Sequence, residues 1–375
     1  MKIGILTLPL HTNYGGLLQA YALRKTLQDL GHEVWIIDRE KNYHLPLSKL
    51  PIEYVKRFVK KYILRYPNQH IRKEKHEQKE YPLIAQHTDK FIEKYIGERE
   101  IVLSPNLIHP ERFDAIVVGS DQIWRPKYYS NIQDAYLAFA ENWNIKRISY
   151  APSFGTEQWE YNSQQTDQFA RLLKMFDSVS VRESSAVILC KEKFGVIAKH
   201  VADPTLLLNV ADYVAIAKTH PKHNGNLLIS LLDNTSDKQD LIDSIINLKG
   251  YVPFYINSKT EDKTATLADR IAPPVEGWVR GFYDADFVIT DSFHAACFSI
   301  MFNKPFLVYG NAQRGLARFN SILKVFGLED RLITSFAEFK DDMVTKPINW
   351  GTVNKKWNEF KLEGIEFLKT SLNSY

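Results

Sequence analysis

The feature that most constrains the fold is a repeated alternation of short, continuously apolar runs with longer segments that carry apolar residues near helical spacing. The first forty residues already contain it, as KIGILTL, then LLQAYALRKTLQDL, then EVWIID. Strands that are apolar throughout are typical of parallel sheets covered by helices on both faces. Strands that alternate with helices predict βαβ units. The sequence therefore predicts an α/β fold built on parallel sheets.

The same alternation occurs in two blocks. Strand signals of the first block continue through FDAIVVG, RISYAPS, SVSVRE and AKHVADPTLLL, where Pro204 ends regular structure. Those of the second block are NLLISLL, YVPFYIN, DFVIT and KPFLVYG. Because 375 residues are too many for one ordinary core, two domains are the default. We expect two doubly wound, Rossmann-like domains that face a cleft.

The expected domain boundaries follow from this restart near residue 205. Residues 1–205 form the N-terminal domain, with a polar helical insertion at 40–105. Residues 206–350 form the C-terminal domain. Residues 351–375 are helix-like, and we expect them to pack back on the N-terminal domain.

Apolar runs and cysteines limit the class of protein. The longest apolar runs are about strand length and are interrupted by polar residues, so we expect no membrane span. The opening MKIGILTLPL lacks the long apolar region and small-residue cleavage site of a signal peptide. Cys190 and Cys297 alone cannot supply a disulfide framework or a metal cage. We expect a cytoplasmic, reduced protein.

Positive charge gathers in residues 56–75, which carry eight Lys and Arg residues against the single acid Glu74. One interpretation is a solvated helical face. The other is a dock for the inner face of a membrane, because basic residues interleaved with Phe58, Tyr62, Ile63 and Leu64 suit an anionic interface. No recognised nucleic-acid module accompanies the stretch, so we expect no nucleic-acid partner.

Polar residues follow the first apolar strand in HTNYGG. In open α/β sheets, ligands bind beyond the carboxyl ends of the strands. The glycine pair would let backbone approach a ligand, and the helix N-terminus beyond it favours an anion or a hydroxyl. A tight loop without a ligand is the alternative. The pattern is not the dinucleotide fingerprint, whose third glycine and ribose-binding acid are missing. The candidate residues here are Asn13, Tyr14, Gly15 and Gly16.

Two further strand ends carry candidate residues. Asp121, Gln122 and Trp124 follow DAIVVG, and a carboxylate, an amide and an indole suit sugar recognition. The alternative is a helix-capping aspartate beside a packed tryptophan. Arg182 follows SVSV, where an arginine is costly unless it is paired. Its partner is either the neighbouring Glu183 or an anionic ligand.

The stretch FVITDSFHAACF places His294 in the first turn of a predicted helix. Either Asp291 or Ser292 could cap that helix. A lone histidine is usually structural, but together with arginines it suits the handling of an anion. The downstream arginines are Arg314 and Arg318, whose alternative role is an ordinary exposed helix start. No spacing of His, Asp or Cys suggests a metal site, and we expect none.

Several blocks together resemble the polysaccharide pyruvyl transferase family, in family order over roughly residues 1–330. They are NYGGLLQAYALRKTLQDLGHEV, FDAIVVGSDQIWRP, ISYAPSFG, VSVRE, ADPTLLL and FVITDSFHAACFSIMFNKPFLV. The resemblance implies a GT-B-like fold and transfer of the enolpyruvyl group of phosphoenolpyruvate onto a sugar as a cyclic ketal. It also implies that His294 lies near the donor and that Arg182 grips it. Ser292 stands where some members have arginine, and Ala295 where many have glycine.

This chemistry agrees with the residue types. Phosphoenolpyruvate carries a phosphate and a carboxylate, which arginines and helix N-termini bind well. We expect Ser292, Arg314 and Arg318 to join Arg182 at the donor. We expect His294 to deliver a proton and Asp121 to orient or deprotonate the acceptor hydroxyl.

On this hypothesis the acceptor residues are Asn13, Tyr14, Gly15, Gly16, Gln122 and Trp124. The acceptor is a sugar of a surface polysaccharide or its precursor, lipid-linked or not, and no cofactor is expected beyond the donor substrate. Two other hypotheses remain: a GT-B glycosyltransferase with a nucleotide-sugar donor, and a non-catalytic module that binds sugars or anions during polysaccharide assembly.

Overall fold

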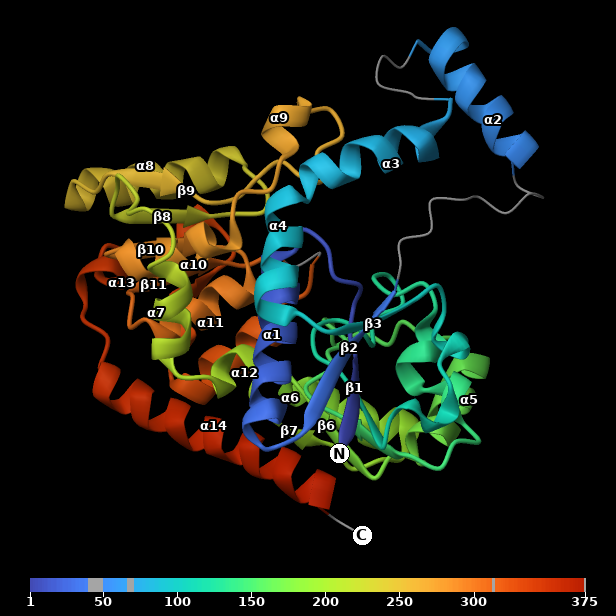
Figure 1. Ribbon diagram of the computed structural model, residues 1–375. Coiled ribbons are helices and arrows are strands. Elements are labelled where there is room, and N and C mark those ends of the chain that lie inside the picture. Colours follow the sequence, from blue (N-terminus) through green and yellow to red (C-terminus); the bar gives the residue numbers. More distant parts are fainter. Residues whose placement is uncertain (40–49, 66–70, 312–313, 374–375) are drawn as a thin grey trace.

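Two parallel sheets, each flanked by helices, form the framework of the protein (Figure 1). The structure is a computed structural model that describes residues 1–39, 50–65, 71–311 and 314–373. The first sheet has seven strands in the order β3-β2-β1-β4-β5-β6-β7, and every paired strand is parallel. Its strands are β1 (Lys2–Leu6), β2 (Glu33–Arg39), β3 (Arg99–Val102), β4 (Ala115–Val118), β5 (Lys146–Ser149), β6 (Ser178–Val181) and β7 (Lys199–His200).

The second sheet has five parallel strands in the order β12-β11-β10-β8-β9. They are β8 (Leu227–Ser230), β9 (Pro253–Tyr255), β10 (Phe287–Thr290), β11 (Phe306–Tyr309) and β12 (Leu332–Ile333). The strand order reverses between β1 and β4 in one sheet and beside β8 in the other, as doubly wound folds require. The predicted α/β class with two Rossmann-like sheets is therefore confirmed.

The helices also follow the predicted alternation, with an N-terminal group that belongs to the first sheet and its insertion. That group is α1 (Tyr14–Asp29), α2 (Leu50–Phe58), α3 (Lys73–Ile84), α4 (Gln86–Phe91), α5 (Ser163–Leu173) and α6 (Ser184–Leu189). The rest are α7 (Val210–Ala217), α8 (Ser236–Lys249), α9 (Leu267–Arg270), α10 (Val275–Asp284), α11 (Phe293–Met301), α12 (Ala317–Phe326), α13 (Asp342–Thr345) and α14 (Trp350–Asn373). Within the described residues, every helix is too short or too polar to cross a bilayer.

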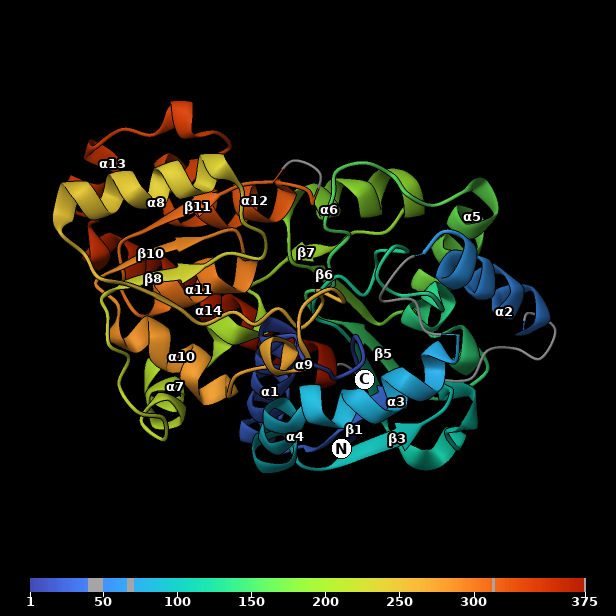
Figure 2. The same ribbon diagram turned by 90° about the horizontal axis from the view of Figure 1, so that it is seen from above.

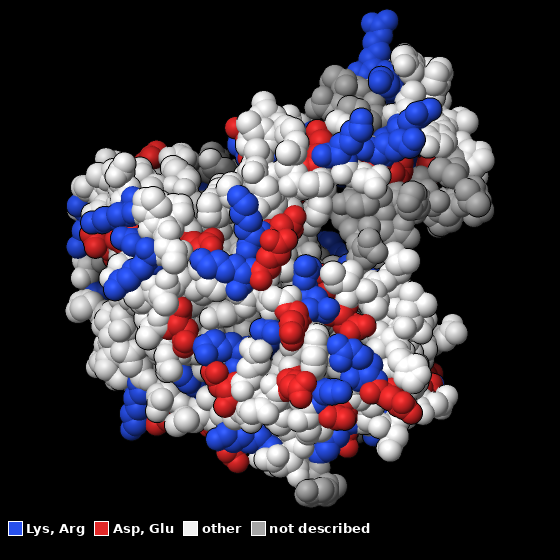
Figure 3. Space-filling model, in the orientation of Figure 1, with Lys and Arg blue, Asp and Glu red and all other residues white. Residues whose placement is uncertain are grey.

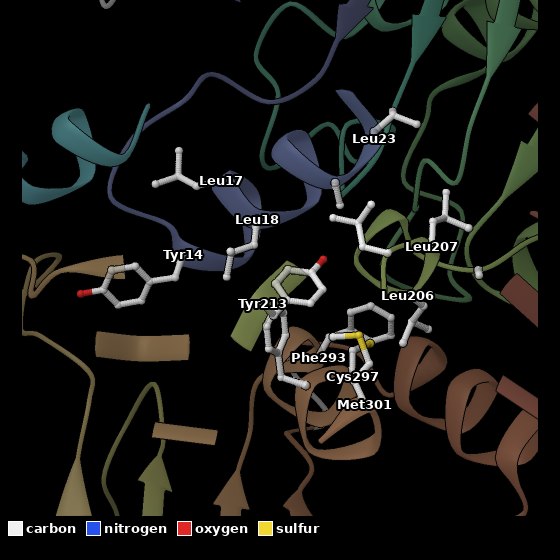
Figure 4. Close-up of a cluster of buried hydrophobic side chains, with 14 of the residues drawn as sticks. Tyr14, Leu17, Leu18, Leu23, Leu206, Leu207, Tyr213, Phe293, Cys297 and Met301 are labelled. Atoms are coloured by element: carbon white, nitrogen blue, oxygen red, sulfur yellow. The ribbon is translucent and has the colours of Figure 1, made fainter. Parts of the chain in front are cut away.

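One hydrophobic core joins the two domains. Helix α1 contributes Leu18, the short 3₁₀ turn Pro204–Leu207 contributes Leu206, and helix α11 contributes Phe293 and Cys297 (Figure 4). These side chains are buried together, so the start of α1 is held against the start of α11. This packing brings residues near position 14 next to residues near position 294, which lie in different sheets.

The insertion and the C-terminal helix also reach across the molecule. Glu80 of α3 pairs with Arg270 of α9 at 3.0 Å, so the insertion touches the C-terminal domain. Trp357 of α14 donates through Nε1 to the carbonyl of Leu206 at 2.9 Å. The ring of Phe367, further along α14, lies 6.2 Å from that of Tyr150, which follows β5 in the N-terminal domain. Helix α14 therefore packs along both domains.

Two edge strands were not expected from the sequence. Strand β3 lies within the segment 40–105, predicted as a helical insertion, and pairs with β2 through Arg99–Val102. Strand β12 has only two residues. Edge strands are short and half solvated, so they lack the continuous apolar run that marks a central strand. Residues 40–49 of the insertion lie outside the described residues.

Candidate functional site

A buried charge network lies where three strands of the N-terminal sheet end. Asp121 follows β4, Arg182 follows β6, and Asp203 comes just after β7. Arg182 donates through Nη1 to Asp203 Oδ2 at 2.9 Å and through Nη2 to Asp121 Oδ1 at 3.2 Å. Its side chain is only 1% exposed. The carboxyl ends of parallel strands meet at one edge of the sheet, and this brings the three charges together.

Of the two partners expected for Arg182, Glu183 is not the one that it pairs with. Glu183 Oε1 instead accepts hydrogen bonds from Ser153 Oγ at 2.9 Å, Phe154 N at 2.9 Å and Gly155 N at 3.1 Å. Glu183 thus holds the loop after β5. The guanidinium of Arg182 is turned to two protein carboxylates, because a buried arginine needs charged partners that are permanently present.

His294 approaches this network from the C-terminal domain. It lies in the first turn of α11, and its Nε2 is 3.6 Å from Asp203 Oδ2. The same carboxylate accepts from Arg182, while Asp203 Oδ1 accepts from Thr205 N at 3.0 Å and from Thr205 Oγ1 at 2.7 Å. The imidazole Nε2 is buried and lacks a hydrogen-bond partner among the described residues.

Gly15 explains how the imidazole fits against helix α1. A Cβ atom added at Gly15 would lie 2.1 Å from His294 Nδ1, which is far inside contact distance. Only glycine therefore permits this approach. At the neighbouring Gly16, an added Cβ would meet nothing closer than an Asn13 atom at 3.6 Å. The predicted close approach of the glycine pair occurs, but the group approached is the histidine.

The charges of the network shift the pKa values of its members. Burial alone would raise the pKa of Asp203, but His294 and Arg182 outweigh it and hold that pKa well below its usual range. Burial acts on Asp121 in the same way, and Arg182 with His294 lowers its pKa. Burial would lower the pKa of Arg182, yet Asp121 and Asp203 raise it above its usual value. Both carboxylates are therefore ionised at neutral pH.

Arg318 is a cation at the site that forms no ion pair with the described residues. It lies in the first turn of α12, half-buried, with its guanidinium 5.8 Å from the ring centroid of Phe293. Its Nε is buried without a hydrogen-bond partner, and within the described ranges the side chain forms no ion pair. Burial and the nearby Arg182 lower its pKa to about 10, so it remains charged at neutral pH. The guanidinium of Arg182 also lies over the ring of Phe293, 4.5 Å from the ring centroid.

A second ionic cluster lies at the strand ends of the C-terminal sheet. Lys238 is buried and donates to Asp291 Oδ2 at 2.7 Å, and it also pairs with Asp233. Arg314 Nη2 lies 2.7 Å from Asp233 Oδ2, and its Nη1 lies 3.6 Å from Asp291 Oδ2. Burial would raise the pKa of Asp233, but Lys238 and Arg314 lower it. Arg314, predicted to bind the donor, therefore already has two carboxylate partners.

Neither Asp291 nor Ser292, the two residues expected to cap α11, forms a capping hydrogen bond with its side chain. Ser292 occupies the N-cap position, but its side chain makes no capping hydrogen bond. Its backbone nitrogen donates to Thr290 Oγ1 at 3.0 Å. Asp291 Oδ1 accepts from the backbone nitrogen of Leu232 at 2.7 Å, so this carboxylate ties β10 to the end of β8. The open N-terminus of α11 remains beside His294.

Two residues expected at the acceptor are committed to protein contacts. Trp124 is 0% exposed, stacks on Tyr136 with 12° between the rings, and donates to the carbonyl of Ala135 at 3.1 Å. The expectation that Trp124 binds a sugar is therefore wrong, because its indole belongs to the core. Tyr14 donates its hydroxyl to the carbonyl of Pro273 at 2.9 Å, and burial raises its pKa above the usual value. Tyr14 thus contacts the C-terminal domain.

The other acceptor candidates lie nearer the surface. Asn13 is exposed and its side-chain oxygen accepts from Gly16 N at 3.1 Å, which caps α1. Gln122 is partly exposed, and its Oε1 accepts from Arg125 Nη1 at 3.4 Å. An added Cβ at Gly155 would lie 2.0 Å from that same oxygen, so Gln122 lies against the loop after β5.

Sequence reasoning missed Asp203, Asp233 and Lys238 as site residues. Asp203 stands in AKHVADPTLLL beside Pro204, which ends regular structure, although a carboxylate after a strand is the signal that selected Asp121. Lys238 lies in a helix whose sequence SDKQDL is that of any solvated first turn. In the part of the chain that the structure describes, no group of His, Cys, Asp or Glu residues has the arrangement of a metal site.

Comparison with solved structures gives the fold. UDP-GlcNAc 2-epimerase from Neisseria meningitidis aligns over 99% of this chain and 99% of its own, with 8% identity and a TM-score of 0.53. A putative UDP-N-acetylglucosamine 2-epimerase from Listeria monocytogenes aligns over 100% and 97%, with 10% identity and a TM-score of 0.52. At this identity the likeness shows the shared two-domain, GT-B-like fold alone.

The sequence itself identifies the family. No curated protein is similar enough in sequence to count as a match. The model of one family, however, matches residues 13–313, which include the glycine pair of α1, Asp121, Arg182, Asp203 and His294. It covers most of the chain and ends just before Arg314. The chain accordingly belongs to the polysaccharide pyruvyl transferase family.

Proposed function

We propose that the interdomain site moves the enolpyruvyl group of phosphoenolpyruvate onto a sugar of a surface polysaccharide or its precursor, as a ketal, with release of phosphate. Membership of the family supports pyruvylation of a polysaccharide. The observation that supports the donor is Arg318, whose guanidinium lies over the ring of Phe293, the residue before His294, and forms no ion pair with the described residues. A phosphate or carboxylate is the ligand that such a group binds best.

The proposed reaction begins with a proton transfer. His294 delivers a proton to the methylene carbon of phosphoenolpyruvate, and the carbon that carries the phosphate ester becomes electrophilic. One sugar hydroxyl adds to that carbon and loses its proton. The carbon–oxygen bond to phosphate then breaks, and a second hydroxyl of the same sugar adds and loses its proton, which closes the ketal. An imidazole can take up and release a proton near neutral pH, as this cycle requires.

In this proposal Asp203 and Arg182 position the imidazole of His294. The ionised carboxylate of Asp203 lies 3.6 Å from His294 Nε2, where it can orient the ring. Arg182 fixes Asp203 from the other side at 2.9 Å. We therefore reassign Arg182 from donor binding to positioning. Asp121, held by the same arginine, keeps its proposed role of orienting the acceptor hydroxyl.

The donor needs access to a histidine that lies buried beneath Gly15. Two interdomain contacts border this point: Tyr14 to the carbonyl of Pro273 at 2.9 Å, and Arg125 Nη1 to the carbonyl of Arg314 at 3.2 Å. Both are single hydrogen bonds of modest strength, about 0.5–1.5 kcal/mol each for neutral pairs and more for charged donors. We infer that these two contacts open to admit the donor and close again around it, while the hydrophobic core shared by the domains holds α1 against α11.

Isothermal titration with phosphoenolpyruvate, and then with a panel of nucleotide sugars, tests the proposal. Wild-type protein should bind phosphoenolpyruvate, and Arg318→Ala should weaken it by roughly 10- to 100-fold, the value of one charge-assisted contact of about 1.5–3 kcal/mol. Lys324→Ala, an exposed site on the same helix, is the matched control and should bind normally. Binding of a nucleotide sugar alone would identify a glycosyltransferase. Ligand binding without turnover on any acceptor would identify a non-catalytic module.

A further inference from the structure

Helix α2 exposes its apolar face to solvent. Val55 and Phe58 are 64% and 52% exposed, and Ile63 in the π-helical turn that follows, Val59–Ile63, is 66% exposed. Figures 1 and 2 show α2 at the periphery of the molecule, away from both sheets. We name residues 51–65 the α2 arm. A contiguous group of exposed apolar side chains is unusual in a protein with no partner for it.

One basic residue of the same helix, Arg57, is turned inward. Arg57 is buried, and its two terminal nitrogens bind Glu74 of α3 at 2.6 and 2.7 Å. Nη1 also donates to the carbonyl of Ile71 at 3.1 Å. A helix on the surface of a globular protein normally does the reverse, with its apolar face packed and its charges in water. The bidentate Arg57–Glu74 pair therefore fixes the orientation in which the apolar face points outward.

The outward residues form a continuous stripe. Ile52, Val55 and Phe58 are spaced by three residues and share one face of α2. Tyr62 continues the stripe, with its ring centroid 4.8 Å from that of Phe58. These four side chains are exposed, as is Leu64, which follows the π-helical turn.

Unpaired basic residues flank the stripe. Lys60, Lys61 and Arg65 form no ion pair with the described residues, and the arm contains one acid, Glu53, which pairs with Lys56 at 3.2 Å. Figure 3 shows Lys and Arg side chains at the end of the molecule where Figure 1 has α2 and α3. An apolar stripe with tyrosine and lysine at its borders is the composition of segments that lie in the interface of an anionic bilayer.

The positive charge of the α2 arm distinguishes two possible partners for the apolar stripe, a second copy of the chain and a lipid surface. A second copy of the chain would meet it in a two-fold contact, which sets the same patch of each copy against the other. The basic residues of both arms would then be gathered in one contact, and like charges repel. An anionic lipid surface instead satisfies both halves of the arm, because acyl chains cover the apolar residues and headgroup phosphates attract the basic ones.

We propose that the α2 arm docks the protein on an anionic lipid membrane. The N terminus, where β1 begins, lies on the side of the N-terminal domain opposite to α2 and α3 (Figure 1). The arm is thus on the side where the parallel strands end and where Asp121 and Arg182 follow them. Docking would bring the candidate site toward the lipid surface. The proposal does not depend on which donor the site uses.

Co-sedimentation of the full-length protein with vesicles tests the docking. Wild type should sediment with vesicles of phosphatidylcholine and phosphatidylserine, and much less with phosphatidylcholine alone. Phe58→Asn and the double variant Lys60→Glu/Lys61→Glu should each lower the partition coefficient at least tenfold. Binding of the wild type should weaken as salt is added, because screening reduces the attraction to the headgroups. All these side chains are exposed or partly exposed, so thermal unfolding should be unchanged.

Matched controls distinguish binding through the α2 arm from nonspecific adsorption of the protein to vesicles. Ile197→Asn removes the most exposed apolar side chain of the described residues, 90% exposed and outside the arm. Lys191→Glu/Lys193→Glu makes the same charge change on an exposed surface elsewhere. Both should sediment like wild type. Equal sedimentation of the arm variants and wild type, or no sedimentation of wild type, would overturn the proposal. A wild-type dimer in analytical ultracentrifugation that Phe58→Asn dissolves, without vesicle binding, would make the arm a contact between copies.

Discussion

His294 Nε2 lies 3.6 Å from Asp203 Oδ2, and this contact crosses from one domain to the other. The histidine begins helix α11 of the C-terminal domain, whereas the carboxylate follows the last strand of the N-terminal sheet. Neither domain alone contains the pair. A change that moves the domains relative to one another therefore changes the environment of the imidazole, and the predictions below use this dependence.

Arg182→Ala should destabilise the protein more than it weakens donor binding. The change would leave Asp121 and Asp203 buried without their common partner, and breaking such a buried pair costs about 3–5 kcal/mol. Thermal unfolding measures the loss. This outcome reverses the expectation drawn from the sequence, in which Arg182 gripped the donor. A folded, equally stable variant that no longer binds phosphoenolpyruvate would restore that expectation.

Asp203→Asn should remove a pH-dependent part of the stability. The pKa of Asp203 is lower in the folded protein than in the unfolded chain, so the carboxylate stabilises the fold above about pH 4–5. That contribution is lost as the pH falls toward the folded-state pKa. Urea unfolding should therefore show the largest difference between wild type and variant near pH 7, and a smaller difference as the pH falls below about 5. A difference that stays constant or grows on acidification would contradict this sign.

Gly15→Ala should reduce turnover by about 10²-fold, because the added Cβ would lie 2.1 Å from His294 Nδ1, well inside contact distance, and would displace the imidazole. Gly16→Ala is the matched control, since its added Cβ would meet only Asn13 atoms at ordinary contact distance, 3.6 Å or more. Steady-state kinetics of both variants measure the effect. Similar activity of the two would show that the close approach of Gly15 to His294 does not matter for the reaction.

The fold could be predicted from the sequence where strands are buried on both faces. Strands β1, β4 and β10 are apolar except for Lys2 and Thr290 at their ends, and each lies inside its sheet. The edge strand β3 (REIV) is half-solvated and β12 has only two residues, so neither carries a distinct apolar run. Sequence periodicity therefore reports burial more than it reports hydrogen bonding.

The candidate site could be predicted only in part, for a related reason. The position of a residue after a strand selected Asp121, Arg182 and His294, which the structure brings together. The same rule selected Trp124, whose indole stacks on Tyr136. That partner lies in a 3₁₀ segment without periodicity, so its contact with Trp124 has no signal in the sequence. Whether a side chain points to the site or to the core is settled by tertiary packing.

The most direct test of the account is the turnover of His294→Gln. An amide keeps a hydrogen-bonding group of similar size but cannot transfer a proton, so pyruvyl transfer should fall by about 10²-fold or more while phosphoenolpyruvate binding falls only modestly. His294→Ala should lose at least as much, and the limb of the wild-type pH profile that belongs to an imidazole should be missing from both variants. Near-normal transfer by His294→Gln, with the wild-type pH profile intact, would show that His294 does not supply the proton.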